Sequence, residues 1–144
     1  MIEKPYEQIS VGDRNITRGR TITEADIVQF AMLSGDWQQL HSDAEYAAAG
    51  RFGQRIAHGM LVLSISTGLT PFVSPYTQAL YGFDRLRFLK PTFIGDTIHV
   101  ETEVANKVDR GDDAGVVTWS HRIVNQHGED VSVSEIKLLV ARSA

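Results

Sequence analysis

Apolar and polar positions alternate along the second half of the chain in four long runs. The runs cover residues 79–89, 97–108, 115–125 and 131–141. Successive side chains of a β-strand point to opposite faces, so this pattern predicts strands with one buried face. The Gly- and Asp-rich segments 109–115 and 126–130 are typical of hairpin connections. We therefore expect an antiparallel meander in this half of the chain.

The first half has helical spacing after one short strand, which we predict around residues 15–20. In residues 21–35, apolar and small side chains recur at intervals of three and four, which places them on one helical face. These residues are Ile27, Phe30, Ala31 and Ser34. Thr23 followed by Asp26 resembles a capping box, and Gly35 suits a C-terminal stop.

A second, shorter helix is predicted over residues 44–49, where "AEYAAA" favours helical backbone. Ser42, with Glu45 three residues later, repeats the capping pattern. Gly50 suits the end of this helix.

The segment that follows Gly59, "MLVLSISTGL", is apolar or small on nearly every helical face. Such a helix is buried on most sides. Pro71 and Pro75 mark its end. The long strands are the elements available to wrap it, so we predict an α+β fold. In this fold a single domain, residues 1–144, wraps an antiparallel sheet around a central buried helix.

Composition narrows the classes of partner and chemistry. The net charge is −4 and no basic cluster stands out, which argues against nucleic-acid binding. No apolar run reaches the roughly 18 residues of a membrane span, and the N-terminus lacks the pattern of a signal peptide, so we expect a cytoplasmic protein without membrane contact. The absence of cysteine excludes thiol catalysis, disulfides and cysteine-ligated zinc.

The polar stretch "SGDWQQLHSD", residues 34–43, places Asp36 five positions before His41. A turn between two helices can bring both side chains to one point. A carboxylate and an imidazole around one water can add or remove water, one group taking a proton while the other delivers one. Capping and solvated side chains are the alternative interpretation of this spacing.

A second stretch, "AHGM", places His58 and Gly59 at the start of the predicted buried helix. The first N–H groups of a helix have no partner within it, and the helix dipole favours negative charge there. Such a donor would stabilise a thioester carbonyl that gains enolate character. The alternative is that His58 caps the helix and Gly59 only permits the turn.

Together these stretches resemble the signature of the MaoC-like, hot-dog-fold (R)-specific enoyl-CoA hydratases, also called hydratase 2. The family pattern is roughly G-D-x-N-P-[LI]-H-x-D, then a Tyr/Phe–Ala segment, a Phe–Gly stretch and a helix that opens with H-G-M/L-L. The matching residues are Gly35, Asp36, Leu40, His41, Asp43, Tyr46, Ala47, Phe52, Gly53, His58, Gly59, Met60 and Leu61. The later segment "RFLKPTFIGDTIHVETEV" also resembles the family.

The resemblance implies reversible hydration of a trans-2-enoyl-CoA to an (R)-3-hydroxyacyl-CoA in fatty acid metabolism. Asp36 and His41 would activate the water and exchange the substrate proton, and the Gly59 N–H would polarise the thioester carbonyl. Thr67 matches the family's supporting hydroxyl, with Ser66 as its rival. The CoA thioester would be substrate, with no cofactor. A homodimer, or a higher homo-oligomer, is implied as well.

One departure concerns the family's Asn-Pro, which is Gln38-Gln39 in this chain. Gln38 offers the same amide on a longer side chain. We expect Trp37 and Phe52 to border the acyl pocket, although a surface or core role is the alternative for Trp37.

Several basic residues could meet the phosphates of CoA, with a solvated surface position as the alternative for most of them. These residues are Arg51, Arg55, Arg85, Arg87 and Lys90. His99, His121 and His127 lie in strand or hairpin patterns and are expected to be structural or exposed. No further His, Asp or Glu cluster has ligand spacing, so we predict no metal site.

Two other functions remain open at the level of the sequence. A hot-dog thioesterase would use Asp36 to activate water toward the carbonyl, but it gives His41 and the "HG" helix start less reason to occur together. A non-catalytic acyl-thioester-binding protein is the second alternative, and the Gln38-Gln39 substitution is the feature that keeps it open.

Overall fold

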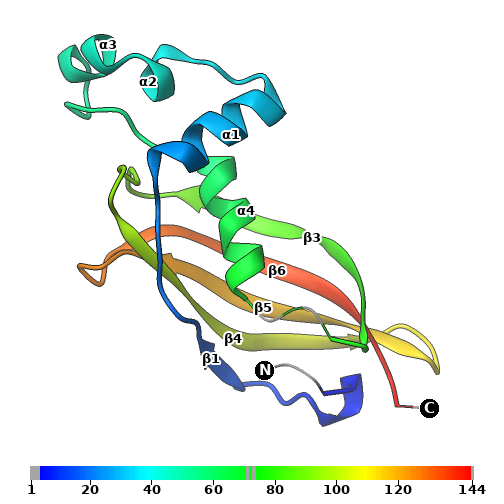
Figure 1. Ribbon diagram of the computed structural model, residues 1–144. Coiled ribbons are helices and arrows are strands. Elements are labelled where there is room, and N and C mark those ends of the chain that lie inside the picture. The colour runs from blue at the N-terminus through cyan, green and yellow to red at the C-terminus, as the bar shows by residue number, and fades with distance from the viewer. Residues whose placement is uncertain (1–3, 71, 73, 144) are drawn as a thin grey trace.

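The computed structural model describes residues 4–70, 72 and 74–143. One six-stranded antiparallel sheet curves beneath the helix labelled α4, and the helices labelled α1, α2 and α3 extend beyond one end of the sheet (Figure 1). The strands are β1 (Arg14–Ile16), β2 (Arg20–Thr21), β3 (Thr77–Phe88), β4 (Thr97–Asp109), β5 (Ala114–Val124) and β6 (Asp130–Ala141). The helices are α1 (Glu24–Ser34), α2 (Gln39–Ser42), α3 (Ala44–Ala49) and α4 (Gly59–Leu69), with a 3₁₀ turn at Tyr6–Gln8.

The four long strands are confirmed, but the predicted meander is only partly right. The spatial order is β1-β4-β5-β6-β3, so β4, β5 and β6 follow one another while β3 pairs with β6 at the far edge. The β3–β4 connection crosses the end of the sheet and is held at both ends. The Leu89 N–H donates to the Val131 carbonyl on β6, and the Ile22 N–H donates to the Asp96 carbonyl beside β4. Alternation shows which face of a strand is buried, not which strand lies beside it.

The single strand predicted around residues 15–20 is wrong. Two short strands, β1 and β2, both pair with β4 and are separated by residues 17–19. The Thr17 hydroxyl accepts a hydrogen bond from the Val100 N–H there. Gly19 lies so close to Thr97 that an added Cβ would be 3.0 Å from its methyl group. The backbone therefore leaves the ladder briefly between the two strands.

Helix α1 begins and ends where the sequence predicts. The Thr23 hydroxyl accepts from the Asp26 N–H, and the Asp26 carboxylate accepts from the Thr23 N–H, which completes a capping box. Gly35 ends the helix with a left-handed backbone, φ 76°. The predicted apolar face is only partly correct, because Ile27 and Ala31 are buried while Ser34 is exposed.

The next two helices differ from the prediction. Residues 39–42 form α2, which the sequence did not indicate, so Ser42 belongs to a helix and does not cap the following one. Its hydroxyl donates to the carbonyls of Trp37 and Gln38. Helix α3 is capped by Asp43, whose carboxylate accepts from the Tyr46 N–H, and it ends before Gly50 as predicted.

Helix α4 starts at Gly59, as predicted, and lies across the inner face of the sheet (Figure 1). Leu61, Val62 and Leu63 are buried against Ile98 and Ile123 of the sheet. The opposite face is not covered by this chain: Met60 is 54% exposed, and Ser64 and Gly68 are also exposed. The prediction of burial on most sides is therefore wrong for this face. The helix ends at Leu69; Pro71 lies outside the described residues.

A second apolar cluster lies at the other end of the sheet around Trp119. Its buried members include Tyr6, Val104, Val117 and Ile136. The Tyr6 ring packs against residue 115 only because that residue is glycine, since an added Cβ would overlap the ring. The core therefore consists of two clusters of buried residues, one beneath α4 and one around Trp119, and the partly buried Phe83 packs against both.

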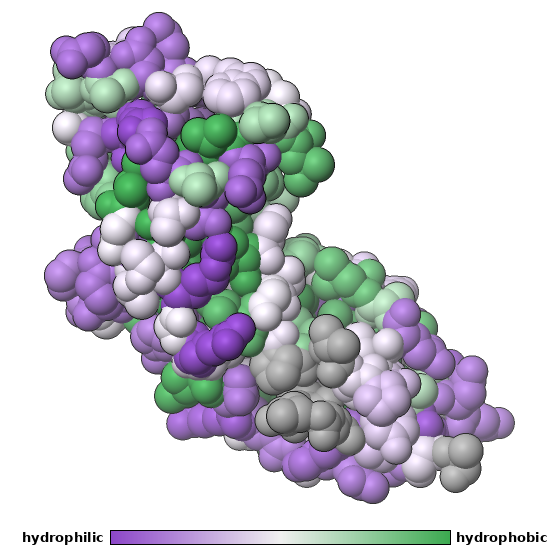
Figure 2. All heavy atoms as spheres, viewed as in Figure 1, coloured by the Kyte–Doolittle hydropathy of each residue, from purple (hydrophilic) through white to green (hydrophobic). Residues whose placement is uncertain are grey.

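Apolar side chains also remain on the surface of this chain. Figure 2 shows hydrophobic residues at the surface where α1 lies, and Met32 and Leu33 are among the most exposed large apolar residues. Within residues 4–70, 72 and 74–143, no helix has the length and apolar character needed to cross a membrane.

Candidate active site

The short helix α2 brings Asp36 and His41 to the start of α4. After the left-handed Gly35, the Asp36 N–H donates to the Ser34 hydroxyl, and the Asp36 carboxylate accepts from the Gln38 N–H at 3.3 Å. Helix α2 then turns His41 inward, where it is buried. The polar stretch that looked like a surface turn therefore presents one of its two chemical groups to the interior.

The backbone sets the tautomer of His41. Its Nδ1 lies 2.8 Å from the carbonyl oxygen of Ile56. A carbonyl oxygen only accepts, so Nδ1 carries the hydrogen and Nε2 carries a free lone pair. The Ile56 N–H donates to Leu40 and the Ala57 N–H to Thr92, so this carbonyl is itself held on both sides. His41 is thus oriented as a proton acceptor.

His58 contacts both Asp36 and His41, which its position as N-cap of α4 does not predict. Its side chain makes no capping hydrogen bond to the backbone of α4 within the described residues. Instead its Nε2 lies 2.9 Å from the carbonyl oxygen of Asp36, and its ring stacks on His41 with centroids 3.8 Å apart and planes 28° apart. His58 therefore occupies the N-cap position, but its side chain does not cap the helix.

The side chains of Asp36, His41 and His58 each place one polar atom within 4.8 Å of the other two. Two histidines and a carboxylate are a common ligand set for divalent metals. However, metal–imidazole bonds lie in the plane of each ring, and the two rings are stacked nearly face to face. In-plane lone pairs of stacked rings run side by side and do not converge on one point. This geometry suits proton transfer better than metal binding.

Gly59 is the first residue of α4 and lies against the ring of Phe88 from β3. An added Cβ would be 2.9 Å from Phe88 Cζ, closer than side-chain carbons normally approach. The first N–H of α4 to bond within the helix is that of Val62, which donates to the His58 carbonyl. The N–H groups of Gly59, Met60 and Leu61 thus form the open amide end of the helix.

A pocket of about 360 Å³ joins these elements. His41 and Gly59 both line it. Its walls combine apolar side chains, including Phe52, Val62, Phe88, Leu89 and Val131, with the cations Arg51 and Lys90. Asp36 is not among the lining residues, but a carboxylate oxygen of Asp36 lies within 4.8 Å of a ring nitrogen of His41. A proton acceptor, a helix N-terminus and an apolar wall therefore meet in one cavity.

Comparison with known proteins agrees with this arrangement. Residues 8–126 match the family described as MaoC like domain. The chain belongs to the MaoC-like family. Its relatives include the (R)-specific enoyl-CoA hydratase of Aeromonas caviae, which is 36% identical over 104 residues, or 72% of this chain and 75% of that protein. Protein MaoC of Klebsiella aerogenes is 40% identical over 126 residues, 83% of this chain, but the chain spans only 37% of that protein.

Solved structures place this MaoC-like chain among hot-dog folds. A structure described as a monoamine oxidase regulatory protein from Archaeoglobus fulgius superposes with a TM-score of 0.92 and is 39% identical, covering 97% of this chain and 95% of that chain. A Mycobacterium tuberculosis protein described as a double hotdog fold is 19% identical, with a TM-score of 0.87 over 99% of this chain and 46% of that chain. The predicted hot-dog fold is confirmed.

The supporting residues expected from the MaoC-like pattern lie elsewhere in this single chain. The Ser66 hydroxyl is fully buried and donates to the Leu63 carbonyl, and the Thr67 hydroxyl donates to the Ser64 carbonyl. Neither residue lines the pocket that holds His41. Gln38 acts through its backbone, because its carbonyl accepts from the N–H groups of His41 and Ser42.

The expected substrate-binding residues divide into two groups. Phe52 lines the pocket, whereas Trp37 is 53% exposed and lines a separate open groove of about 750 Å³, which also reaches Phe52. Neither Arg85 nor Arg87 lines the pocket: Arg85 pairs with Glu135 at 3.0 Å, and Arg87 donates to the Leu86 carbonyl. The cations at the pocket are Arg51 and Lys90, the latter paired with Glu129.

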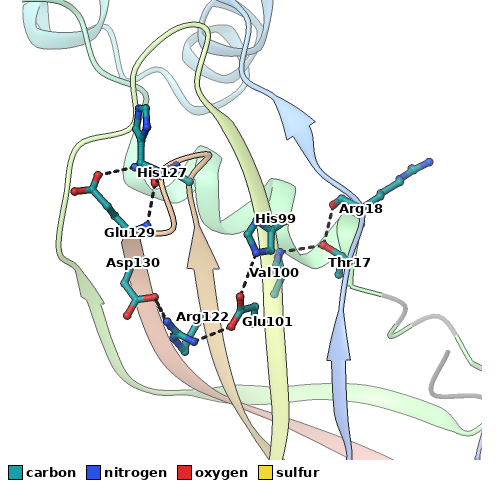
Figure 3. Close-up of polar contacts among 10 residues, drawn as sticks. Thr17, Arg18, His99, Val100, Glu101, Arg122, His127, Glu129 and Asp130 are labelled. Carbon is teal, nitrogen blue, oxygen red and sulfur yellow. Dashed lines mark hydrogen bonds and ion pairs between the residues drawn. The ribbon is translucent and has the colours of Figure 1, made fainter.

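The remaining histidines do not line the pocket, and Figure 3 shows two of them, His99 on β4 and His127 in the hairpin between β5 and β6. His99 Nε2 is 3.2 Å from a Glu101 carboxylate oxygen, and His127 is held by its own N–H, which donates to Asn125. His121 is buried within the sheet core, and burial lowers its pKa from 6.5 to about 4.

Two features of the pocket carry no signal in the sequence. The Ile56 carbonyl, which sets the His41 tautomer, is a backbone group in an irregular segment. Phe88 reaches Gly59 from a strand that is distant along the chain. Arg51 and Lys90 were detectable only as two of several candidate cations. Each of these contacts joins positions that only the tertiary fold brings together.

Proposed function

We propose that this MaoC-like protein interconverts a trans-2-enoyl-CoA and an (R)-3-hydroxyacyl-CoA. The observation that carries the proposal is the Nε2 lone pair of His41, which the Ile56 carbonyl leaves free in a pocket that also contains the start of α4. The named activity of relatives such as the Aeromonas caviae hydratase supports it. The (R) configuration is taken from those relatives.

In the proposed reaction, the carboxylate of Asp36 orients a water and Nε2 of His41 takes one of its protons. The hydroxide oxygen forms a bond to C3 while the C2=C3 electron pair moves toward the thioester. The N–H groups at the start of α4, that of Gly59 first, stabilise the negative charge on the thioester oxygen. The proton held by His41 then passes to C2, which leaves both side chains as they began.

The pocket also suits the two ends of the proposed substrate. Phe52, Val62 and Phe88 provide apolar surface for a short or medium acyl chain, and Arg51 and Lys90 provide cations for the phosphates of CoA. We propose that the reaction needs no metal or other cofactor, because the stacked arrangement of His41 and His58 suits proton transfer.

We further propose that the protein works as a homodimer or a higher homo-oligomer. Met60 on the exposed face of α4, and Leu80 and Tyr81 on the edge strand β3, are large apolar residues that this chain leaves exposed. A second copy of the same chain would bury both surfaces and remove an open sheet edge.

One assay tests the proposed reaction against both alternatives. Purified protein is mixed with crotonyl-CoA, with and without EDTA, and the loss of enoyl absorbance and the release of free thiol are followed separately. Loss of absorbance without free thiol, unchanged by EDTA, is the expected result. Release of free thiol would indicate a thioesterase. Binding of crotonyl-CoA without either change would indicate a non-catalytic acyl-thioester-binding protein.

A further inference from the structure

The ring of His58 lies where three parts of the proposed site meet. The residue is the N-cap of α4, so its own peptide leads directly into Gly59. The residue is only 2% exposed, although its side chain makes no capping bond to α4 within the described residues. The buried side chain therefore contacts other elements and not the backbone of α4.

The first of these contacts is with the Asp36 backbone. His58 Nε2 lies 2.9 Å from the Asp36 carbonyl oxygen, so Nε2 carries the hydrogen and donates it. Nδ1 is buried and has no hydrogen-bond partner among the described residues. The orientation of the ring is thus set by a single hydrogen bond, which ties the Asp36 loop to the start of α4.

The second set of contacts is made by the His58 ring with two neighbouring rings. One face stacks on His41 at 3.8 Å, and Phe30 of α1 approaches the ring at 5.0 Å with planes 53° apart. His58 thus adjoins one ring from α1 and one from α2. The Ile56 hydrogen bond fixes one edge of His41, and the His58 ring limits how far His41 can tilt.

We propose that His58 is a positioning residue that holds Asp36, His41 and the Gly59 N–H in the geometry needed for one substrate. The inference rests on the proposed hydration, because it assigns His58 a role in that reaction. His58 acts through these three groups and not on the reacting atoms. Displacing a catalytic group by about 1 Å can lower the rate by about 100-fold, so loss of the ring should act on turnover.

Three variants separate the two contacts. His58→Ala removes both the ring and the donor, and we expect kcat to fall by about 10- to 100-fold with KM changed less than about 3-fold. His58→Phe keeps a ring without the N–H donor, and His58→Gln keeps an N–H donor without the ring. Each of these should recover part of the loss. His121→Gln, at a buried histidine of the sheet, is the matched control for lost stability.

A double-mutant cycle distinguishes positioning from a general loss of stability. If His58 acts through Asp36, His58→Ala should lower kcat much less in an Asp36→Asn background than in the wild-type protein. Equal losses in both backgrounds would overturn the proposal, as would wild-type kcat in His58→Ala.

An NMR measurement keeps the inference testable apart from the proposed function. Long-range ¹H–¹⁵N spectra should show His41 as the Nδ1–H tautomer in the wild-type protein, because of the Ile56 carbonyl, and should show exchange-broadened His41 ring signals in His58→Ala, because the ring loses the stacked neighbour that limits its tilt. An unchanged His41 spectrum would overturn the positioning role even if no enoyl-CoA is turned over. Absence of turnover by the wild-type protein, with a changed His41 spectrum in the variant, would instead reject only the proposed reaction.

Discussion

The His41 imidazole donates through Nδ1 to the Ile56 carbonyl at 2.8 Å, and this single bond decides which ring nitrogen can accept a proton. The residue is buried in α2, and its Nε2 remains free for the site. The contact links the short helix to the irregular segment before α4. Its consequences can be tested by substitution at both members of the proposed acid–base pair.

Asp36→Asn and His41→Ala should each lower kcat for crotonyl-CoA hydration by at least about 100-fold, because a group that transfers or orients a proton is lost. Circular dichroism and thermal unfolding should show a folded protein in both cases. Near-normal kcat in either variant would reject the assigned roles. Arg85→Ala, at a residue outside the pocket, is a suitable control.

Gly59→Ala should reduce activity more than stability. The added Cβ would meet the tip of the Phe88 ring, which is 47% exposed and can turn away, so we expect the free energy of unfolding to change by less than about 1 kcal/mol. The displaced ring would reshape the pocket next to the Gly59 N–H, and kcat/KM should fall by about 10-fold or more.

Combining Gly59→Ala with Phe88→Leu tests whether the clash with Phe88 causes the loss of activity. Because leucine is smaller than phenylalanine, the double variant should regain part of the activity that Gly59→Ala loses. Failure of Phe88→Leu to restore any activity in the Gly59→Ala background would show that contact with Phe88 is not the reason for glycine at this position.

Gln39→Pro should stabilise the protein. Gln39 is the first residue of α2, a position where the N–H has no partner within the helix and where proline is favoured. The preceding Gln38 has φ −55° and ψ 138°, an extended conformation that proline accepts in its neighbour. We expect about 0.4–1 kcal/mol of added stability, measured by denaturant unfolding, with activity retained. Gln38→Pro is the contrasting variant, because the Gln38 N–H donates to Asp36 and would be lost.

Acid should destabilise the protein through His121. Burial lowers the pKa of this histidine from 6.5 to about 4, so between these values the unfolded chain binds a proton that the folded chain excludes. The free energy of unfolding is therefore not reduced by this histidine above pH 6.5. It decreases as the pH falls from 6.5 toward 4, by up to about 3 kcal/mol.

The measurement is urea unfolding of the wild-type protein and His121→Gln at several pH values. Because the carboxylates titrate in both proteins, the difference between the two curves isolates the histidine. A difference that is constant between pH 6.5 and 4 would contradict the assignment.

Local patterns in the sequence determined much of this protein. The period of two predicted β3 to β6, and the Thr23–Asp26 pair and Gly35 set both ends of α1. The start of α4 at Gly59 and the chemical nature of Asp36 and His41 were also evident. These features depend on near neighbours along the chain, where spacing and side-chain type are sufficient.

Only the tertiary structure decided how these parts meet. It placed β3 beside β6, brought His41 to a carbonyl 15 residues away, and brought His58, for which capping was only the alternative interpretation, to the Asp36 carbonyl 22 residues away. These contacts join backbone groups and rings that are distant along the chain, and the residue types do not indicate which groups will meet. Packing of α4 on the sheet, with α2 held against the segment before α4, selects among many compatible pairings and forms the pocket from two short motifs.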